Sequence, residues 1–417
     1  MFNLLIFEVI PFHLLLLKDG KLAATDQSTK LIHYISLLIY ILSALLLYYS
    51  SHDLNMSFDS YQYLAAAQSF ADSGTLLNAD GSVYSNWGPM FPVILSFVAD
   101  VDNYRAVNLV VYAMLFWLSH LLIVRMVDTP ILRLLVSLWI AFSTPVLMQF
   151  NFLWSESIFI FLFLVQIIVF FRYRETNKMG WLILLIVLSA VSCLQRYAGL
   201  FIIPGFALLI IMDRGYKLRS FLISFVYGGL ACLPVLVWMY SRYQSSGGGF
   251  SMFLTNLYAS FFSNLYRSYY QDVFFSWFVP SSLTFELGHY YVLGTLILVI
   301  LFRKQLKVPR FKFEIQSLLI LSGVYFLFLN LIDYSAIIHP DMTFGGLSDF
   351  ERYLSIIYIP VILLLFVWLS QKLPLIEHKT TRVVLLGLIC LWSIYPISRS
   401  IKNTLDWKEY TSSAVVK

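Results

Sequence analysis

The sequence predicts an all-α membrane protein that crosses the bilayer many times. Of the 417 residues, 59% are hydrophobic and only 12% are charged, and the mean hydropathy is +0.78. This composition lies outside the range of soluble domains. Apolar runs of about 18 or more residues, the length needed to cross a hydrocarbon core, recur along nearly the whole chain. The protein is therefore expected to be polytopic.

Eleven apolar segments are candidate spans. The first 17 residues are also apolar, but Glu8, Pro11 and His13 interrupt them and no basic stretch precedes them, which disfavours a signal peptide. Residues 1–30 are expected to form a cytoplasmic or interfacial segment, and residues 1–417 a single membrane domain. The candidate spans are residues 31–49, 103–124, 134–150, 153–171, 181–194, 198–212, 220–240, 287–302, 315–333, 353–370 and 381–398.

The distribution of Lys and Arg predicts the topology. With the N-terminus in the cytoplasm, the inside loops hold most of the 28 basic residues, including the run from Arg303 to Lys312. The net charge of +5 then reflects topology and lipid headgroups, and nucleic-acid binding is rejected because no concentrated basic face exists. The inside loops are short, whereas residues 50–102, 241–286 and 334–352 form long outer connections. The active site is thus expected on the outer side of the plasma (inner) membrane.

The first outer loop contains a candidate helix next to an acidic residue. Ser57 or Asp59 can cap a helix that runs to about Asp72, and Gly74 is a natural stop. Such a helix, with Tyr61, Leu64 and Ala65 on its apolar face, would lie along the membrane surface and hold Asp59 near the bilayer boundary. Trp87, Pro89 and Pro92 then predict an ordered turn and a return into the membrane.

Three more ionisable residues interrupt or begin apolar segments, where charges are costly and usually functional. Glu156 lies in the first turns of a span, Arg196 in the break between two short spans, and Arg352 at the start of another. On the predicted topology all three lie at the level of Asp59, so two carboxylates and two guanidiniums are expected to converge. The alternatives are a helix-start carboxylate and arginines that snorkel or pair with Glu351. Asp333 is a weaker candidate.

The loop between Phe250 and Phe278 is rich in aromatic residues and follows the flexible stretch SSGGG. Its aromatic side chains either anchor the loop at the headgroups or form a mobile wall against a lipid tail or an acceptor sugar. The cysteines Cys193, Cys232 and Cys390 lie in apolar segments without metal-ligand spacing and are interpreted as core residues.

Short motifs resemble those of the GT-C glycosyltransferases, polytopic enzymes that use polyprenyl-phosphate sugars. The similar stretches are FDSYQYLAAAQSFADSG, WGPMFPVILS, SESIFIFLFLV, QRYAGLFIIPG and ERYLSIIYIP. They span roughly residues 50–370, and the most similar group contains the protein O-mannosyltransferases and the lipid A aminoarabinose transferases. The resemblance implies a bundle of about 11 transmembrane helices with juxtamembrane helices on the outer side.

The resemblance also implies roles for individual residues. Asp59 matches the catalytic aspartate, Glu156 a second acid that binds the sugar, and Arg196 and Arg352 the basic positions that meet the donor phosphate. Two departures stand out: Ser60 occupies the position where many relatives have a second acid, and the large soluble C-terminal domain of some relatives is missing. Candidate contacts to acceptor or lipid are Tyr61, Tyr63, Trp87, Tyr197 and Tyr353.

The predicted function is transfer of a sugar from a polyprenyl-monophosphate donor to an acceptor hydroxyl, with inversion and with Asp59 as general base. The acceptor is a glycan, a lipid or a protein. No cofactor is expected; a divalent metal such as Mg²⁺ is the less favoured alternative. Two other functions stay open: a transporter or flippase, which would bind its substrate near the bilayer midplane, and a polymerase or ligase of diphosphate-linked glycans.

Overall fold

The computed structural model describes residues 27–51, 54–85, 87–98, 100–246, 269–284, 287–301, 313–332 and 347–414. Across these residues the chain is helical, and the extended pairings are two isolated bridges, Asn55 with Phe152 and Leu77 with Val83. The prediction of an all-α chain is confirmed. Residues 1–26 of the predicted N-terminal segment 1–30, most of the aromatic loop and Asp333 lie outside the described residues.

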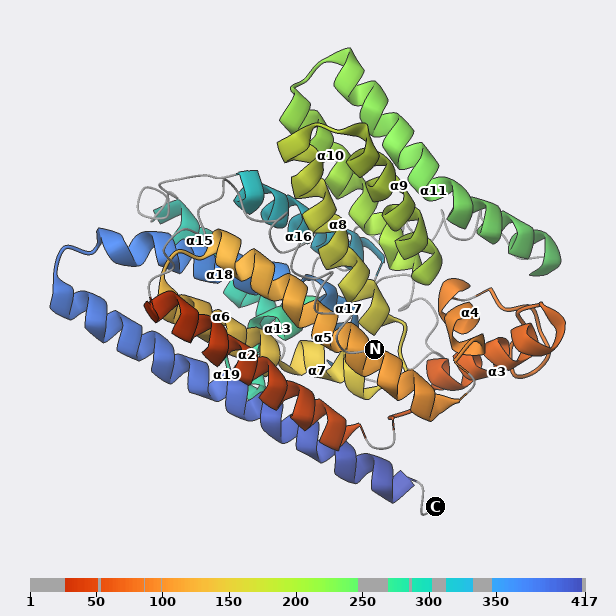
Figure 1. The fold of residues 1–417 in the computed structure, drawn as a ribbon, viewed down its shortest axis with the longest axis horizontal. Helices are drawn as coiled ribbons and strands as arrows, with labels where there is room; N and C mark the ends of the chain where they lie inside the picture. Colours follow the sequence, from red (N-terminus) through yellow and green to blue (C-terminus); the bar gives the residue numbers. More distant parts are fainter. Residues whose placement is uncertain are drawn as a thin grey trace.

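Helices coincide with all eleven candidate spans (Figure 1). Eight helical stretches are long and apolar enough to cross a membrane, and two shorter apolar helices match two further spans. The chain is therefore a multi-pass membrane protein. The helices that match the spans are α2 (Gln27–Ser50), α5 (Val101–Met126), α6 (Pro130–Ala141), α7 (Thr144–Asn151), α8 (Glu156–Thr176), α9 (Met179–Gln195), α10 (Ile202–Arg214), α11 (Leu218–Ser246), α15 (Gly288–Leu301), α16 (Phe313–Ile332), α18 (Tyr358–Lys372) and α19 (Lys379–Ala414).

One expected span, residues 134–150, is two helices. Helix α6 ends at Ala141, and α7 begins after Ser143, whose hydroxyl accepts a hydrogen bond from the backbone N–H of Val146 at 3.3 Å. Pro145 lies in the first turn of α7, where a missing N–H costs little. A serine cap followed by proline thus restarts the helix within an apolar run.

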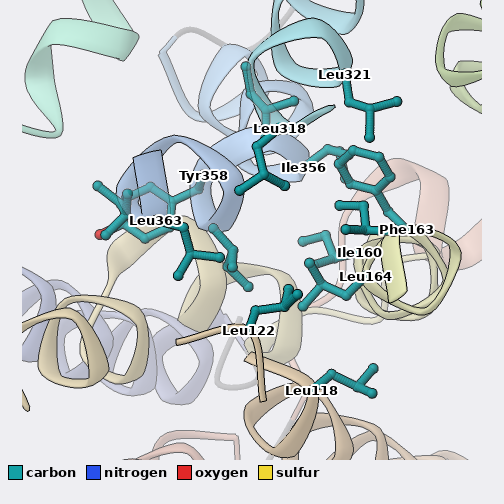
Figure 2. Packing of buried hydrophobic residues seen from close by; sticks show 14 of the residues in the cluster. Leu118, Leu122, Ile160, Phe163, Leu164, Leu318, Leu321, Ile356, Tyr358 and Leu363 are labelled. Carbon is teal, nitrogen blue, oxygen red and sulfur yellow. The ribbon is translucent and has the colours of Figure 1, made fainter. Parts of the chain in front are cut away.

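The main core lies where α5, α8, α16 and α18 meet (Figure 2). Helix α8 is central, since 78% of its most apolar stretch is buried, against 11% for α19. The outer faces of α19, α11 and α2 carry exposed Leu, Val and Ile side chains, as expected for lipid-facing helices. The labelled core residues of Figure 2 are Leu118, Leu122, Ile160, Phe163, Leu164, Leu318, Leu321, Ile356, Tyr358 and Leu363.

A second, smaller core joins the first outer loop to the bundle. It contains buried side chains of α3 (Phe58–Ser73) and α4 (Met90–Ser96), among them Tyr63 and Phe91, together with Tyr104 of α5 and Leu153 before α8. Figure 1 shows α3 and α4 together at one edge of the molecule. The juxtamembrane pair is thus attached to the bundle near the start of α8.

The helix predicted between Ser57 and Asp72 is confirmed. Ser57 is its N-cap, in a capping box with Ser60, and Gly74 ends it with a positive φ of 70°, which glycine adopts without a Cβ penalty. The side that packs on the protein is a different face from the apolar face predicted to lie on the membrane. Ser60 and Tyr63 are fully buried, whereas Tyr61 is 61% exposed.

Candidate active site

The strand-like segment before α3 lies alongside the turn between α7 and α8. The backbone N–H of Asn55 donates to the carbonyl of Asn151 at 3.0 Å, and the N–H of Leu153 donates back to the carbonyl of Asn55 at 3.0 Å. This short parallel pairing connects parts of the chain that are almost 100 residues apart. It fixes the register between the N-terminus of α3 and the N-terminus of α8.

Two side-chain hydrogen bonds continue this pairing into the site. The hydroxyl of Ser60 donates to the carbonyl of Leu153 at 3.0 Å, and the indole N–H of Trp154 donates to the hydroxyl of Ser57 at 2.8 Å. Together they determine which face of α3 points inward, because Ser60 must face α8. Asp59 lies in the first turn of α3, two residues after the Ser57 that Trp154 contacts.

Glu156 is the first residue of α8 and is completely buried. Its Oε1 lies 2.6 Å from Nη1 of Arg196 and also contacts Nε of Arg352, while its Oε2 accepts a hydrogen bond from Nη2 of Arg352 at 3.2 Å. A buried carboxylate is stable only when it is paired. Glu156 therefore does more than complement the dipole of α8, because it binds two guanidiniums from distant parts of the chain.

Arg352 bridges the two carboxylates. It lies on α17 (Leu347–Leu354), and its Nη1 is 2.7 Å from Oδ2 of Asp59 while its other nitrogens contact Glu156. The guanidinium also lies over the ring of Trp154, with Cζ 4.3 Å from the centroid. Gln149 on α7 fixes the backbone by donating to the Arg352 carbonyl at 3.1 Å. The guanidinium is thus in contact with Asp59, Glu156 and the Trp154 ring.

Arg196 enters the site from the break between α9 and the 3-10 turn Tyr197–Phe201. Its Nη1 contacts Glu156 and donates to the hydroxyl of Ser155 at 2.8 Å. Nearby, the amide of Gln195 donates to the Ser155 carbonyl at 3.0 Å. The end of α9 is thereby attached to the start of α8.

Gly88 allows the first outer loop to approach this helix end. A Cβ at Gly88 would lie only 2.2 Å from the carbonyl oxygen of Leu194 and 2.8 Å from that of Gln195. Any other residue must displace the backbone. The predicted Trp87–Pro89 turn is therefore packed directly against the segment that carries Arg196.

Two of the predicted tyrosines border the charged cluster. The hydroxyl of Tyr63 is 3.3 Å from that of Ser155, and burial raises the pKa of Tyr63 well above its usual range. The ring of Tyr353 lies below both guanidiniums, with centroid distances of 5.3 Å to Arg196 and 5.8 Å to Arg352. Both rings form walls of the site.

The other three predicted contacts lie farther out. Trp87 packs on the Tyr63 ring at 5.8 Å, and Tyr197 donates to the Ser85 carbonyl at 2.9 Å. Tyr61 is exposed. The structure thus brings Asp59, Glu156, Arg196 and Arg352 together, with Tyr63 and Tyr353 beside them, and leaves Tyr61 outside.

The cluster contains two carboxylates and two guanidiniums, so its formal charges cancel. The side-chain exposures are 0% for Glu156, 5% for Arg352, 9% for Arg196 and 17% for Asp59. Asp59 is therefore the acid that faces the surroundings. No group of three or more His, Cys, Asp or Glu side chains suited to a metal ion occurs within the described ranges.

Sequence reasoning missed four polar residues that hold this cluster, Trp154, Ser155, Gln149 and Gln195. Two of them directly precede Glu156 in the stretch WSES, which was a usable signal because a polar residue beside a buried acid is a natural partner. Gln149 and Gln195 gave no such signal, since their partners lie far away in sequence.

No protein-family profile matches the chain, and no curated protein matches it. Its structure resembles two crystal structures of ArnT from Cupriavidus metallidurans. For ArnT bound to undecaprenyl phosphate, the TM-score is 0.49 at 12% identity, over 85% of this chain and 63% of the other. For the apo state the TM-score is 0.47 at 14% identity, over 84% and 62%. The chain thus spans less than two thirds of the length of ArnT.

Proposed function

We propose that the protein is a membrane glycosyltransferase of the GT-C type. It transfers a sugar from a polyprenyl-monophosphate donor to an acceptor hydroxyl. The observation that carries this proposal is the single cluster in which Asp59, Glu156, Arg196 and Arg352 meet. Four charges that come from four separate segments and meet in an apolar protein are expensive, and such groups usually serve function.

The arginines suit the phosphate of the donor. Guanidinium groups recognise phosphate through paired hydrogen bonds and keep their charge when buried. In the reaction the bond between the anomeric carbon and the phosphate oxygen breaks, and the leaving phosphate takes the electron pair. A guanidinium of Arg196 beside that oxygen would stabilise the growing negative charge. The donor's lipid tail would remain in the bilayer.

Asp59 is assigned the general base. Its side chain is 17% exposed, whereas that of Glu156 is 0% exposed, so an acceptor can reach Asp59 more easily. As the acceptor oxygen forms its bond to the anomeric carbon, its proton moves to the Asp59 carboxylate. A single displacement of this kind inverts the anomeric centre. Glu156 then holds the arginines and, as a second acid, binds the sugar.

Aromatic side chains around Asp59 suit an acceptor or a lipid tail. Phe58 and Tyr61 flank it in the first turn of α3 with exposures of 71% and 61%, and Phe58 lies 6.4 Å from the Trp87 ring. Aromatic faces pack well on apolar surfaces. The excess of basic residues in the predicted inside loops supports a site on the outer face of the plasma membrane, with the N-terminus in the cytoplasm.

The test is donor turnover by the purified full chain in nanodiscs. Polyprenyl-monophosphate sugars are supplied as a panel with an envelope extract as the source of acceptor, and release of polyprenyl phosphate is measured. Wild type should consume one donor, and Asp59→Asn should lose at least a hundredfold in kcat, as expected for loss of a general base (roughly 10²–10⁴-fold). Asp72→Asn is the matched control, because Asp72 lies on the same helix and, among the residues that the structure describes, bonds only to Gln68.

Two results would count against the proposal. If Asp59→Asn turns over like wild type, Asp59 is not the base. If folded wild-type protein consumes no donor, transport of a lipid-linked substrate becomes the better interpretation. Transport would then be measured with the protein reconstituted into liposomes made of the same lipids.

A further inference from the structure

We propose that the two arginines have different roles: Arg196 receives the donor phosphate, while Arg352 is a positioning residue that holds Asp59 and releases it when the phosphate arrives. This inference rests on the proposed function and assigns an order to its first steps. The sequence had given both arginines the same task.

The first observation is that all three nitrogens of Arg352 are occupied. Nε and Nη2 contact Glu156, and Nη1 contacts Asp59. Its backbone carbonyl accepts hydrogen bonds from Gln149 at 3.1 Å and from the Ser355 hydroxyl at 2.6 Å. These contacts engage three of the five N–H groups of the guanidinium, including the Nε and Nη2 edge that Glu156 occupies. Each of the two remaining N–H groups is on a nitrogen that already contacts a carboxylate, so a phosphate there would lie close to the negative charge of Glu156 or Asp59.

The second observation is that Arg196 is only partly occupied. Its Nη1 contacts Glu156 and Ser155. Its Nε and Nη2 make no hydrogen bond within the described part of the chain. Neither atom is completely buried, so both N–H edges are accessible. Two adjacent N–H groups of a guanidinium form the fork that matches phosphate. An incoming phosphate would therefore meet Arg196 first.

The third observation identifies the contact of Arg352 that would break. Its bond to Glu156 uses two nitrogens and a carboxylate with 0% exposure, whereas its bond to Asp59 uses one nitrogen and a carboxylate with 17% exposure. An uncompensated Glu156 would be a fully buried charge, while a released Asp59 can be solvated. A phosphate that adds negative charge beside Arg196 would therefore attract Nη1 of Arg352 away from Asp59.

The consequence is that Asp59 becomes available as a base only after the donor has bound. In the resting site the Asp59 carboxylate is in contact with the guanidinium of Arg352, so an acceptor hydroxyl has to compete with that contact. The arrangement predicts ordered binding, with the donor before the acceptor.

The test measures binding of undecaprenyl phosphate to the full chain in nanodiscs. Arg196→Lys and Arg352→Lys keep the charge but lose the fork. Arg125→Lys is the matched control, because Arg125 also bridges two carboxylates, Glu175 and Glu314, away from this site. We expect Arg196→Lys to weaken binding at least tenfold. Arg352→Lys should weaken it threefold or less while lowering kcat at least tenfold at an almost unchanged donor KM.

A spectroscopic signal separates the proposal from a merely structural role of Arg352. Because its guanidinium lies 4.3 Å over the Trp154 ring, withdrawal from Asp59 should change the environment of that indole. The fluorescence change on adding undecaprenyl phosphate, taken as wild type minus Trp154→Phe, should fall by more than half in Asp59→Asn, where Arg352 is already released. If Trp154→Phe does not fold, ¹⁹F resonances of 5-fluorotryptophan in wild type and Asp59→Asn give the same comparison.

The inference is overturned if Arg352→Lys weakens lipid binding as much as Arg196→Lys, or if Asp59→Asn keeps the full Trp154 signal. In both cases the lipid still binds and the proposed function survives. If undecaprenyl phosphate does not bind to wild-type protein at all, the proposed function and this inference both fail.

Discussion

The two ends of α8 carry the same kind of ion-pair cluster in different surroundings. At the first end, Glu156 binds Arg196 and Arg352. At the last turns, Glu175 binds Arg125 at 2.6 Å and Arg172 at 2.9 Å. The side chains of the first cluster are 0–9% exposed where they meet Glu156, whereas those of the second are 12–21% exposed. Each cluster joins one glutamate to two arginines, but the side chains of the second cluster are more exposed to solvent.

This difference in burial indicates which of the two clusters has a functional role. Exposed ion pairs contribute little, about 0–1 kcal/mol, and a cluster such as that of Glu175 is an ordinary way to end helices near headgroups. A buried cluster gains no more stability than apolar packing would, because desolvation offsets the attraction. Helix α8, at about 1.5 Å per residue, is long enough to separate the two clusters by roughly 30 Å. The four substitutions below would break or sharpen this comparison.

Glu156→Gln should have the largest effect. It leaves Arg196 and Arg352 without their shared carboxylate in a buried site, which is expected to destabilise the protein by about 3–5 kcal/mol. Donor turnover should be lost as well. The check is thermal unfolding of the detergent-solubilised protein followed by intrinsic fluorescence. An unfolding midpoint within a degree of wild type would show that the cluster is less desolvated than its exposure indicates.

Gly88→Ala should rank second, with a loss of about 1–3 kcal/mol from overpacking, because its Cβ would overlap the Leu194 carbonyl. The displaced loop should also lower activity through Arg196. The matched control is Gly180→Ala near the other end of α9, where a Cβ meets nothing within 4 Å and helix propensity predicts a gain of about 0.5–1 kcal/mol. Equal unfolding midpoints for both variants would contradict the close packing at Gly88.

Tyr63→Phe should cost about 1 kcal/mol, since it removes one buried hydroxyl contact and keeps the ring. Burial raises the pKa of Tyr63 in the folded state, so the folded protein holds this proton more tightly than the unfolded chain. The protonated hydroxyl therefore makes its full contribution to the free energy of unfolding below the ordinary tyrosine pKa of about 10. That contribution declines only as the pH rises above this value. Stability curves of wild type and variant should therefore run parallel from pH 6 to 9, and a divergence there would show that Tyr63 titrates earlier.

Glu175→Gln should have the smallest effect, below about 1 kcal/mol, with donor turnover unchanged. Because its partners are partly exposed, the small loss should shrink further at high salt. Unfolding midpoints at two NaCl concentrations check this. A loss as large as that of Glu156→Gln would mean that the two ends of α8 do not differ in the way their burial indicates.

Local patterns made much of the fold predictable. The capped helix after Ser57 and its stop at Gly74 follow from residues that act on their nearest neighbours. The convergence of Asp59, Glu156, Arg196 and Arg352 could be anticipated because charges in apolar segments need partners at the same depth.

What could not be predicted depends on contacts between distant segments. The inward face of α3 is set by the Ser60 bond to Leu153 rather than by the apolar residues Tyr61 and Leu64. The division between the two arginines likewise depends on which nitrogen each carboxylate reaches. Neither the spacing nor the composition of the sequence contains that information.

The long sequence separation within the cluster has a consequence for biogenesis. Glu156 and Arg352 are 196 residues apart, and chains grow at about 5–20 residues per second, so Glu156 would leave the ribosome roughly 10–40 s before Arg352. Arg196 follows Glu156 much sooner and can shield it during this interval. The start of α8 can therefore settle in the bilayer early as a two-residue pair, whereas Asp59 acquires its own cation only when Arg352, in the last third of the chain, has been inserted.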